Sequence, residues 1–168
     1  MPPQDVKLVV TDVDGVLTDG TIGLDGRGEE FKVFSVQDGL GARLLEESGI
    51  GVGFLSSRDS PVVRLRAEQL GIDLHFSGVD EKKPQLEEIL RSRGVERAET
   101  CYLGDDLLDI PCLRLVGFPV AVANARDEVK AHAEYVTRLS GGHGAFREVS
   151  ELVLRARGLW ELALERYQ

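Results

Sequence analysis

The sequence predicts an α/β fold: an open parallel sheet with helices on both faces. Short apolar runs that suit buried strands alternate along the chain with longer segments that suit helices. The connections between them are short, and such alternation is typical of a parallel sheet covered by helices. The chain has 168 residues, of which 42% are hydrophobic and 29% charged. We therefore expect residues 1–168 to form a single domain with a sizeable core.

The elements are expected in a regular order, without internal repeats or linkers. The clearest strands are the continuous apolar runs, and the segments that read as strands lie at 7–11, 51–55, 74–76, 100–103, 119–122 and 135–137. The segments that read as helices lie at 39–48, 60–70, 82–93, 107–114, 126–132 and 145–156. In the C-terminal part, 145–168, the apolar spacing of 158–164 suits a further helix, docked on its own domain or on a neighbouring subunit.

One segment, 21–34, breaks the alternation. Its residues alternate between apolar and polar around Asp25-Gly26, which indicates a β-hairpin directly after the first strand. A two-stranded ribbon is marginally stable alone, and this one carries many apolar side chains: Ile22, Leu24, Phe31, Val33 and Phe34. We expect these side chains to be buried between subunits.

Charge and hydropathy exclude several classes of protein. A net charge of −9 argues against nucleic-acid binding. No apolar stretch approaches the roughly 20 residues that a membrane helix needs, and residues 1–7 lack a signal-peptide pattern. Cys101 and Cys112 form no CxxC pair, and we interpret both as reduced structural residues. We expect a cytoplasmic protein.

The most informative motif follows the first strand. Leu8-Val9-Val10 leads into Asp12 and Asp14, then Gly15. In an open α/β sheet, ligands bind at the carboxyl ends of the strands. Two carboxylates there repel one another unless a cation lies between them, which points to a divalent metal with one nucleophile and one acid/base. The alternative is a solvated loop that happens to contain two acids.

Two other strand ends carry matching chemistry. Ser56 and Arg58 follow 51–55, where a hydroxyl near a helix N-terminus suits a phosphate oxygen, although helix capping also explains this position. Asp105 follows 100–103 and suits the oxygen shell of Mg²⁺, while Asp106 or Asp109 is expected to cap the next helix.

Lys82 and Lys83 open the helix 82–93, against the direction of its dipole. This local disadvantage indicates a use elsewhere: a lysine directed at the strand ends would neutralise carboxylates and a phosphate together. The residues alone do not choose between the two lysines, and a solvated pair is the alternative.

Together these motifs resemble those of the haloacid dehalogenase-like phosphohydrolases, and the resemblance covers almost the whole chain. The order is that of the family: an acidic pair, a Ser/Thr at a strand end, a Lys, and a Gly-Asp-Asp. Details are similar to the small capless subfamily that includes phosphatases of 3-deoxy-manno-octulosonate 8-phosphate; they lie at Val16–Gly20, Phe34–Gly41, Gly104–Pro111 and Gly141–Glu148. The resemblance implies a Rossmann-like domain, a hairpin after the first strand and no cap domain.

The resemblance also implies roles for individual residues. Asp12 would be the nucleophile that forms an aspartyl-phosphate, and Asp14 the general acid/base. Mg²⁺ would be held by the Asp12 carboxylate, the Asp14 carbonyl and the Asp105 carboxylate. Ser56 would bind the phosphate, and Lys82 fits the family's spacing to Leu86 better than Lys83 does. The other residues expected to contact substrate or lie beside it are Ser57, which replaces the family's usual glycine, Arg58, Gly142 and Arg147.

Spacing leaves no room for a large cap, because about 40 residues separate Asp14 from Ser56 and about 25 separate Ser56 from Lys82. Capless relatives assemble as tetramers in which neighbours cover each site. We expect a homotetramer here, with hairpin 21–34 as the central contact and Gly142–Arg147 and the tail near a neighbour's site.

Three functional hypotheses remain within the family. The first is a phosphatase of 3-deoxy-manno-octulosonate 8-phosphate. The second is a sialic-acid-type 9-phosphate phosphatase, and the third a non-catalytic relative of the domain fused to acylneuraminate cytidylyltransferases. A response-regulator receiver also uses Asp, Ser/Thr, Lys and Mg²⁺, but its phosphorylated Asp lies on a later strand than its acidic pair. In this chain the acidic pair itself closes the first strand, which argues against a receiver.

Overall fold

Six parallel strands form the central sheet in the order β5-β4-β1-β6-β7-β8. The structure is a computed structural model that describes residues 3–168. Residues 1–2, which belong to the segment 1–7 that lacks a signal-peptide pattern, lie outside the described residues. The strands are β1 (Leu8–Thr11), β4 (Gly51–Leu55), β5 (Leu74–Phe76), β6 (Thr100–Gly104), β7 (Phe118–Ala121) and β8 (Tyr135–Val136). The predicted α/β sheet and all six predicted strands are confirmed.

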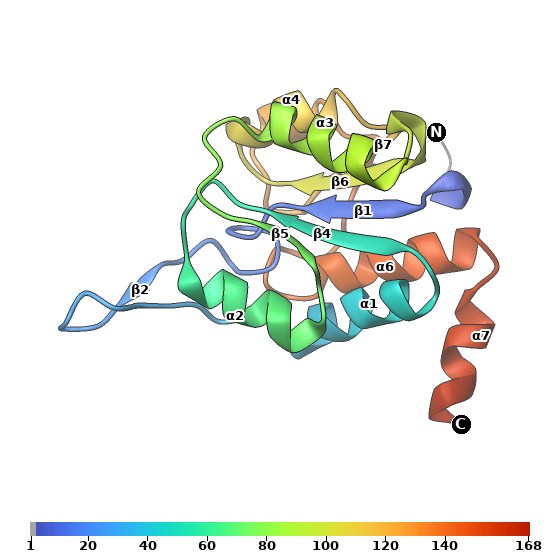
Figure 1. Ribbon diagram of the computed structural model, residues 1–168, viewed down its shortest axis with the longest axis horizontal. Helices are drawn as coiled ribbons and strands as arrows, with labels where there is room; N and C mark the ends of the chain where they lie inside the picture. The colour runs from blue at the N-terminus through green and yellow to red at the C-terminus, as the bar shows by residue number, and fades with distance from the viewer. Residues whose placement is uncertain (1–2) are drawn as a thin grey trace.

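Helices cover both faces of this sheet. They are α1 (Val36–Glu47), α2 (Pro61–Leu70), α3 (Lys82–Arg93), α4 (Ile110–Leu113), α5 (Asp127–Lys130), α6 (Ala145–Ala156) and α7 (Trp160–Leu164). Figure 1 shows α1, α2 and α6 on one face and α3 and α4 on the other. Among the described residues, no helix combines the length and the apolar character needed to cross a membrane.

The strand order creates a switch point beside β1. The chain runs from β1 through β4 to β5 on one side, then crosses back to β6 on the other side of β1. Helices that connect the two halves therefore diverge at the carboxyl ends of β1 and β6, and ligands of open α/β sheets bind in the crevice that this leaves. The residues that follow β1, β4 and β6 meet there.

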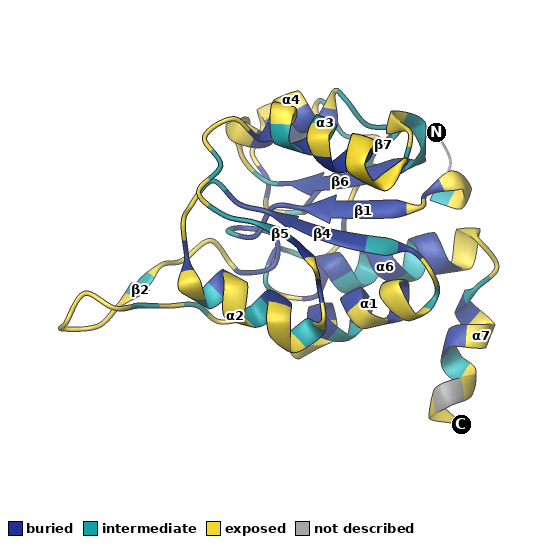
Figure 2. Ribbon diagram, viewed as in Figure 1, coloured by how far each residue is buried: buried dark blue, intermediate teal, exposed yellow. Residues whose placement is uncertain are grey.

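The hairpin is shorter than the predicted segment 21–34. Its strands are β2 (Gly23–Leu24) and β3 (Glu30–Phe31), joined by a turn in which Asp25 accepts the N–H groups of Arg27 and Glu29. It projects from the same side of the molecule as the carboxyl ends of β1 and β4 (Figure 1), and most of its length is exposed (Figure 2).

Three predicted helices differ from the observed ones. The helix expected at 39–48 begins at Val36, because Ser35 caps it by accepting the N–H of Gln37. The segment 107–114 is a 3₁₀ turn, Leu107–Asp109, followed by the short α4, since Asp106 and Asp109 form a reciprocal capping box. The helix expected at 126–132 is only the single turn α5.

The core lies between the sheet and its two helical layers. Val9, Val10 and Tyr102 are wholly buried at its centre, and Cys101 and Cys112 are buried free thiols, as predicted. Glycine permits a close contact between α1 and α6: a Cβ on Gly41 of α1 would lie 2.8 Å from Ser150 Oγ of α6. The tail docks on its own domain through Trp160, which Arg155 covers at 4.4 Å from the ring centroid.

Candidate active site

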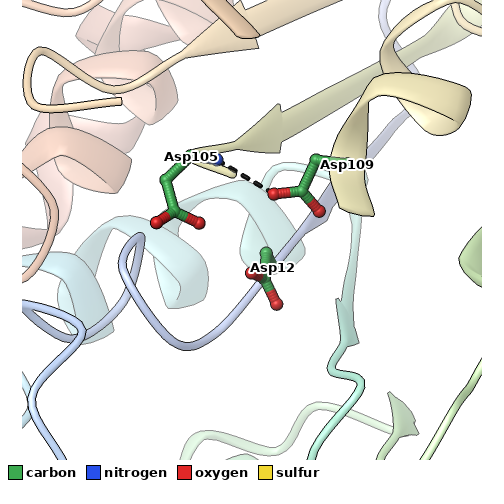
Figure 3. Close-up of side chains that lie close together, drawn as sticks. All are labelled: Asp12, Asp105 and Asp109. Carbon is green, nitrogen blue, oxygen red and sulfur yellow. Dashed lines mark hydrogen bonds between the residues drawn. The ribbon is translucent and has the colours of Figure 1, made fainter. Parts of the chain in front are cut away.

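Three carboxylates meet at the carboxyl ends of β1 and β6. Asp12, Asp105 and Asp109 each present an oxygen within 4.8 Å of the others, as Figure 3 shows. Asp12 and Asp109 are almost entirely buried. Hard oxygen donors grouped in this way are the ligands that Mg²⁺ uses. The grouping includes Asp12 and Asp105 as the sequence predicts.

Lys82 supplies the positive charge within the acidic cluster. Its Nζ lies 2.9 Å from Asp12 Oδ1 and 2.7 Å from Asp109 Oδ1, and only 4% of the residue is exposed. Burial lowers the pKa of Lys82, but the two carboxylates outweigh burial and raise it above its ordinary value. Lys83 is exposed, so Lys82, which the family spacing favours, is the one of the two lysines that lies in the cluster.

Asp109 organises the cluster and has a larger role than the helix cap expected for it. Its Oδ1 accepts from Lys82 Nζ and from the hydroxyl of Tyr102, at 2.7 and 2.8 Å. Its Oδ2 accepts the backbone N–H groups of Asp105 and Asp106, at 2.9 and 3.3 Å. Because four donors occupy these oxygens, Asp109 serves to hold the lysine and the Asp105 loop in place.

Gly15 lets the loop after β1 approach the loop after β6 closely. A Cβ at this position would lie 2.0 Å from Asp105 Oδ2, and its φ of +95° is strained for any other residue. The glycine of the Asp-x-Asp-Gly motif is thus required by the position of Asp105.

The electrostatics of the cluster are unfavourable without a cation. Burial, and then the charge of Asp109, raise the pKa of Asp12 well above its usual range despite the opposing effect of Lys82. Burial, followed by Asp109 and Asp106, raises the pKa of Asp105 to about 7. One ammonium group therefore does not offset the three clustered carboxylates.

Three buried side-chain oxygens lack a hydrogen-bond partner among the described residues. They are Asp14 Oδ2, Ser57 Oγ and Asp105 Oδ1, which follow β1, β4 and β6 respectively. Buried polar atoms are nearly always paired, so each exception needs an explanation. Their occurrence at three adjacent strand ends indicates that a ligand supplies the missing contacts.

The second strand end presents two hydroxyls rather than one. Ser56 Oγ is buried and accepts the N–H of Arg58 at 3.2 Å, whereas Ser57 Oγ has no partner. Arg58 extends toward the hairpin and donates to Glu30 Oε2 at 2.6 Å. Glu30, and beyond it Asp14, raise the pKa of the Arg58 guanidinium.

The hairpin brings a second lysine to the site, and the sequence reasoning missed it. Lys32 Nζ donates to Asp14 Oδ1 and lies 3.4 Å from Glu30 Oε1. Asp14, Lys32, Glu30 and Arg58 thus form a continuous polar network across the rim. The alternation of apolar and polar residues in 21–34 predicted the hairpin. It did not predict how the hairpin lies relative to the site, and this orientation places Lys32 beside Asp14.

The loop 141–144 lies against the loop that follows β1. Gly142 N–H donates to Val16 O at 2.9 Å, and a Cβ on Gly141 would meet Gly15 O at 1.7 Å. Buried Asp38 of α1 holds the end of this loop and the start of α6, because its Oδ2 accepts the N–H of Gly144 at 3.3 Å and its Oδ1 accepts the N–H of Arg147 at 2.8 Å. Asp38 was also missed by sequence reasoning.

The side chain of Arg147 is directed elsewhere in this chain. Its Nε donates to Glu151 at 2.8 Å and its guanidinium lies over Trp160 at 5.7 Å. With Arg138 and Arg155 it lines a surface hollow of about 550 Å³. Within one chain, the structure does not bring Arg147 into contact with the acidic cluster.

Comparison with known proteins agrees with this geometry. The family described as haloacid dehalogenase-like hydrolase matches residues 44–147, and the chain belongs to this family. Its fold and site define a hydrolase of that class.

Among named relatives, the chain is similar to 3-deoxy-D-manno-octulosonate 8-phosphate phosphatases. It is 44% identical to that of Haemophilus influenzae over 92% of this chain and 86% of the relative. It is 40% identical to that of Escherichia coli K12, over 92% and 82%. The structure of the Moraxella catarrhalis phosphatase, in complex with magnesium, phosphate and KDO, matches with a TM-score of 0.96 and 38% identity, over 99% of this chain and 95% of that one.

Proposed function

We propose that this chain is a Mg²⁺-dependent phosphatase that hydrolyses 3-deoxy-D-manno-octulosonate 8-phosphate through an aspartyl-phosphate on Asp12. The observation that carries the proposal is the set of unpartnered oxygens at three adjacent strand ends, beside a buried Asp–Lys cluster. The similarity to phosphatases of this substrate supports the choice of sugar over a sialic-acid-type 9-phosphate. The presence of Asp12, Asp14, Lys82 and Asp105 together favours a catalyst over a non-catalytic relative.

Mg²⁺ fits the residues that are present. Asp105 Oδ1 is buried without a partner, and the Asp12 carboxylate lies within the same cluster. Asp109 is already saturated by four donors, which leaves Asp12 and Asp105 as side-chain ligands, with the carbonyl of Asp14 as a third. When bound, Mg²⁺ would offset the negative charge of carboxylates and phosphate.

The chemistry then follows from the side chains. The Asp12 carboxylate attacks phosphorus while the bond to the sugar oxygen breaks, and Asp14 gives a proton to that oxygen. Asp14 next accepts a proton from the water that attacks the aspartyl-phosphate, which releases phosphate and restores Asp12. Lys82 and the hydroxyls of Ser56 and Ser57 stabilise the equatorial phosphate oxygens, whose charge grows in the transition state.

A panel of phosphate esters tests the proposed function. We expect the highest kcat/KM on 3-deoxy-D-manno-octulosonate 8-phosphate, with lower values on 9-phosphates of nine-carbon acidic sugars and on neutral sugar phosphates. A preference for a neutral sugar phosphate would contradict the substrate class. No phosphate release from any ester would contradict catalysis.

Removal of the metal is expected to have a pH-dependent effect on stability. Without a cation, Asp105 keeps its proton up to about pH 7 in the folded protein, whereas it ionises near pH 4 in the unfolded chain. Its raised pKa therefore contributes stability that is present below about pH 4 and lost as the pH rises to about 7. Mg²⁺ replaces that proton and should raise the melting temperature more at about pH 7.5 than at about pH 5.

The melting temperature is compared with and without Mg²⁺ at each pH. This is necessary because other carboxyls, such as Glu30, have lowered pKa values and make the stability of the metal-free protein change with pH in the opposite direction. Asp105→Asn should lose most of the Mg²⁺-dependent rise. An equal rise at both pH values, or a full rise in Asp105→Asn, would contradict the site.

The assembly that we propose is a homotetramer with the hairpin as its central contact. Apolar side chains of the hairpin and the following helix start are exposed in the isolated chain: Leu24 by 65%, Phe31 by 57%, Val33 by 76% and Val36 by 81%. So many exposed large apolar side chains on one short segment favour an interface. Gly142–Arg147 and the tail would lie near a neighbour's site.

The buried free thiols also support our proposal of a cytoplasmic location.

Charge in the hairpin should break this assembly. Phe31→Asp combined with Val33→Asp is expected to give smaller species in light scattering and weaker turnover of the sugar phosphate. Leu24→Asp, on the opposite strand of the hairpin, should reduce the mass in the same way, whereas Leu65→Asp on α2, 55% exposed in the wild type, should not. A fully active monomer would refute the proposal.

A further inference from the structure

Lys32 lies in an unusual position for a residue of an exposed arm. Its neighbours Phe31 and Val33 are 57% and 76% exposed, yet the Lys32 side chain is completely shielded from solvent. An ammonium group removed from water is unfavourable unless it is paired and hydrogen-bonded. Lys32 meets both conditions: it donates a hydrogen bond to Asp14 Oδ1 and forms ion pairs with Asp14 and Glu30.

Glu30 is itself held from the other side of the rim. Arg58 Nη2 donates to its Oε2 at 2.6 Å, and Ser60 Oγ donates to its Oε1 at 2.5 Å. The hydrogen bond from Ser60 is the largest influence on the pKa of Glu30, and with Arg58 and Lys32 it lowers that pKa to about 2 against desolvation. The loop between β4 and α2 therefore fixes an anionic Glu30, which in turn fixes Lys32.

The two oxygens of Asp14 are consequently different. Oδ1 is occupied by the ammonium group of Lys32, whereas Oδ2 is buried and has no partner. A carboxyl that gives a proton to one leaving group needs one oxygen free and its rotamer fixed. The contact with Lys32 provides this asymmetry.

We propose that Lys32 is a positioning residue, which holds Asp14 by Oδ1 so that Oδ2 performs the proton transfers to and from substrate. Glu30, Arg58 and Ser60 form the anchor that holds Lys32. The inference rests on the proposed function, because it assigns Asp14 the acid/base role. It adds that the hairpin carries a working part of the site as well as an apolar surface.

Leaving-group dependence separates this role from a general structural one. An aryl phosphate such as p-nitrophenyl phosphate needs no proton on its leaving group, whereas a sugar phosphate does. We expect Lys32→Met to lower kcat on 3-deoxy-D-manno-octulosonate 8-phosphate by about tenfold or more. The first chemical step on the aryl phosphate, followed as nitrophenolate release in a single turnover, should change by less than about threefold. Lys32→Arg should recover part of the loss, and Lys83→Met, which changes an exposed lysine, should behave like wild type.

A double-mutant cycle with Asp14→Asn gives the decisive comparison. If Lys32 acts through Asp14, adding Lys32→Met to Asp14→Asn should cause little further loss on the sugar phosphate. Additive losses, or equal losses of Lys32→Met on both substrates, would overturn the proposal while leaving the proposed function intact. A wild type that hydrolysed no alkyl phosphate would instead contradict the proposed function, and the positioning role with it. Light scattering of each variant confirms that the assembly is unchanged.

Discussion

Replacing Asp12 with asparagine is expected to abolish phosphate release while the protein remains folded. An amide is a poor nucleophile, and loss of a nucleophile in other hydrolases reduces kcat by on the order of 10⁴-fold or more. The amide oxygen can still accept the N–H of Val13 and the ammonium of Lys82, which now contact Oδ1 at 2.7 and 2.9 Å. Because burial disfavours the Asp12 carboxylate, the melting temperature should stay the same or rise.

The measurement is the steady-state release of phosphate from the sugar phosphate, together with a thermal melt. Asp73→Asn is the matched control, since Asp73 is exposed and precedes β5, at the opposite edge of the sheet. Residual turnover of Asp12→Asn within tenfold of wild type would refute the assignment.

Replacing Lys82 with methionine is expected to affect both activity and stability. Lys82 is the buried cation between Asp12 and Asp109, and removal of one partner from such a group destabilises a protein by about 3–5 kcal/mol. Loss of a cation that stabilises the transferring phosphate should reduce kcat by about 10²–10³-fold. The destabilisation should be smaller at low pH, because Asp12 and Asp105 then become neutral by binding protons.

Urea unfolding at about pH 5 and pH 8 measures the first effect, and kcat under folding conditions the second. Lys83→Met provides the control on the same helix turn. If Lys82→Met matched Lys83→Met in both measurements, Lys82 would have no special role. If Lys82→Met did not fold, Lys82→Arg would retain the charge and should keep the stability while losing activity through its different geometry.

The sequence predicted the sheet because its strands are continuous apolar runs, and the positions of Asp12, Ser56 and Asp105 followed from those strand ends. The predicted helix at 39–48 omitted the first three residues of α1, because the Ser35 cap that begins it was not identified, and the close contact with α6 that explains Gly41 is not visible in one sequence. The turn 107–109 was read as a helix because its periodicity resembles one, whereas the Asp106–Asp109 capping box forms a 3₁₀ turn.

The sequence did not show Lys32, Asp38 or the contact of Asp109 with Lys82, and each of these depends on a partner far along the chain. Lys32 reaches Asp14 across 18 residues, Asp109 reaches Lys82 across 27, and Asp38 reaches Arg147 across 109. Local patterns carry no information about such pairs, whose geometry depends on how separate elements pack. The choice of Lys82 over Lys83 was made by family spacing, and burial of Lys82 provides its physical reason.

The most direct test of the mechanism is to trap the phosphorylated enzyme. Asp14→Asn, mixed with p-nitrophenyl phosphate and Mg²⁺, should transfer the phosphoryl group to Asp12 but hydrolyse the product slowly, because no base activates water. After an acid quench and proteolysis, mass spectrometry should find the peptide containing Asp12 heavier by one phosphoryl group, and Asp12→Asn should show none. Nitrophenolate release by Asp14→Asn without a phosphorylated peptide, or with phosphate on another residue, would contradict the account.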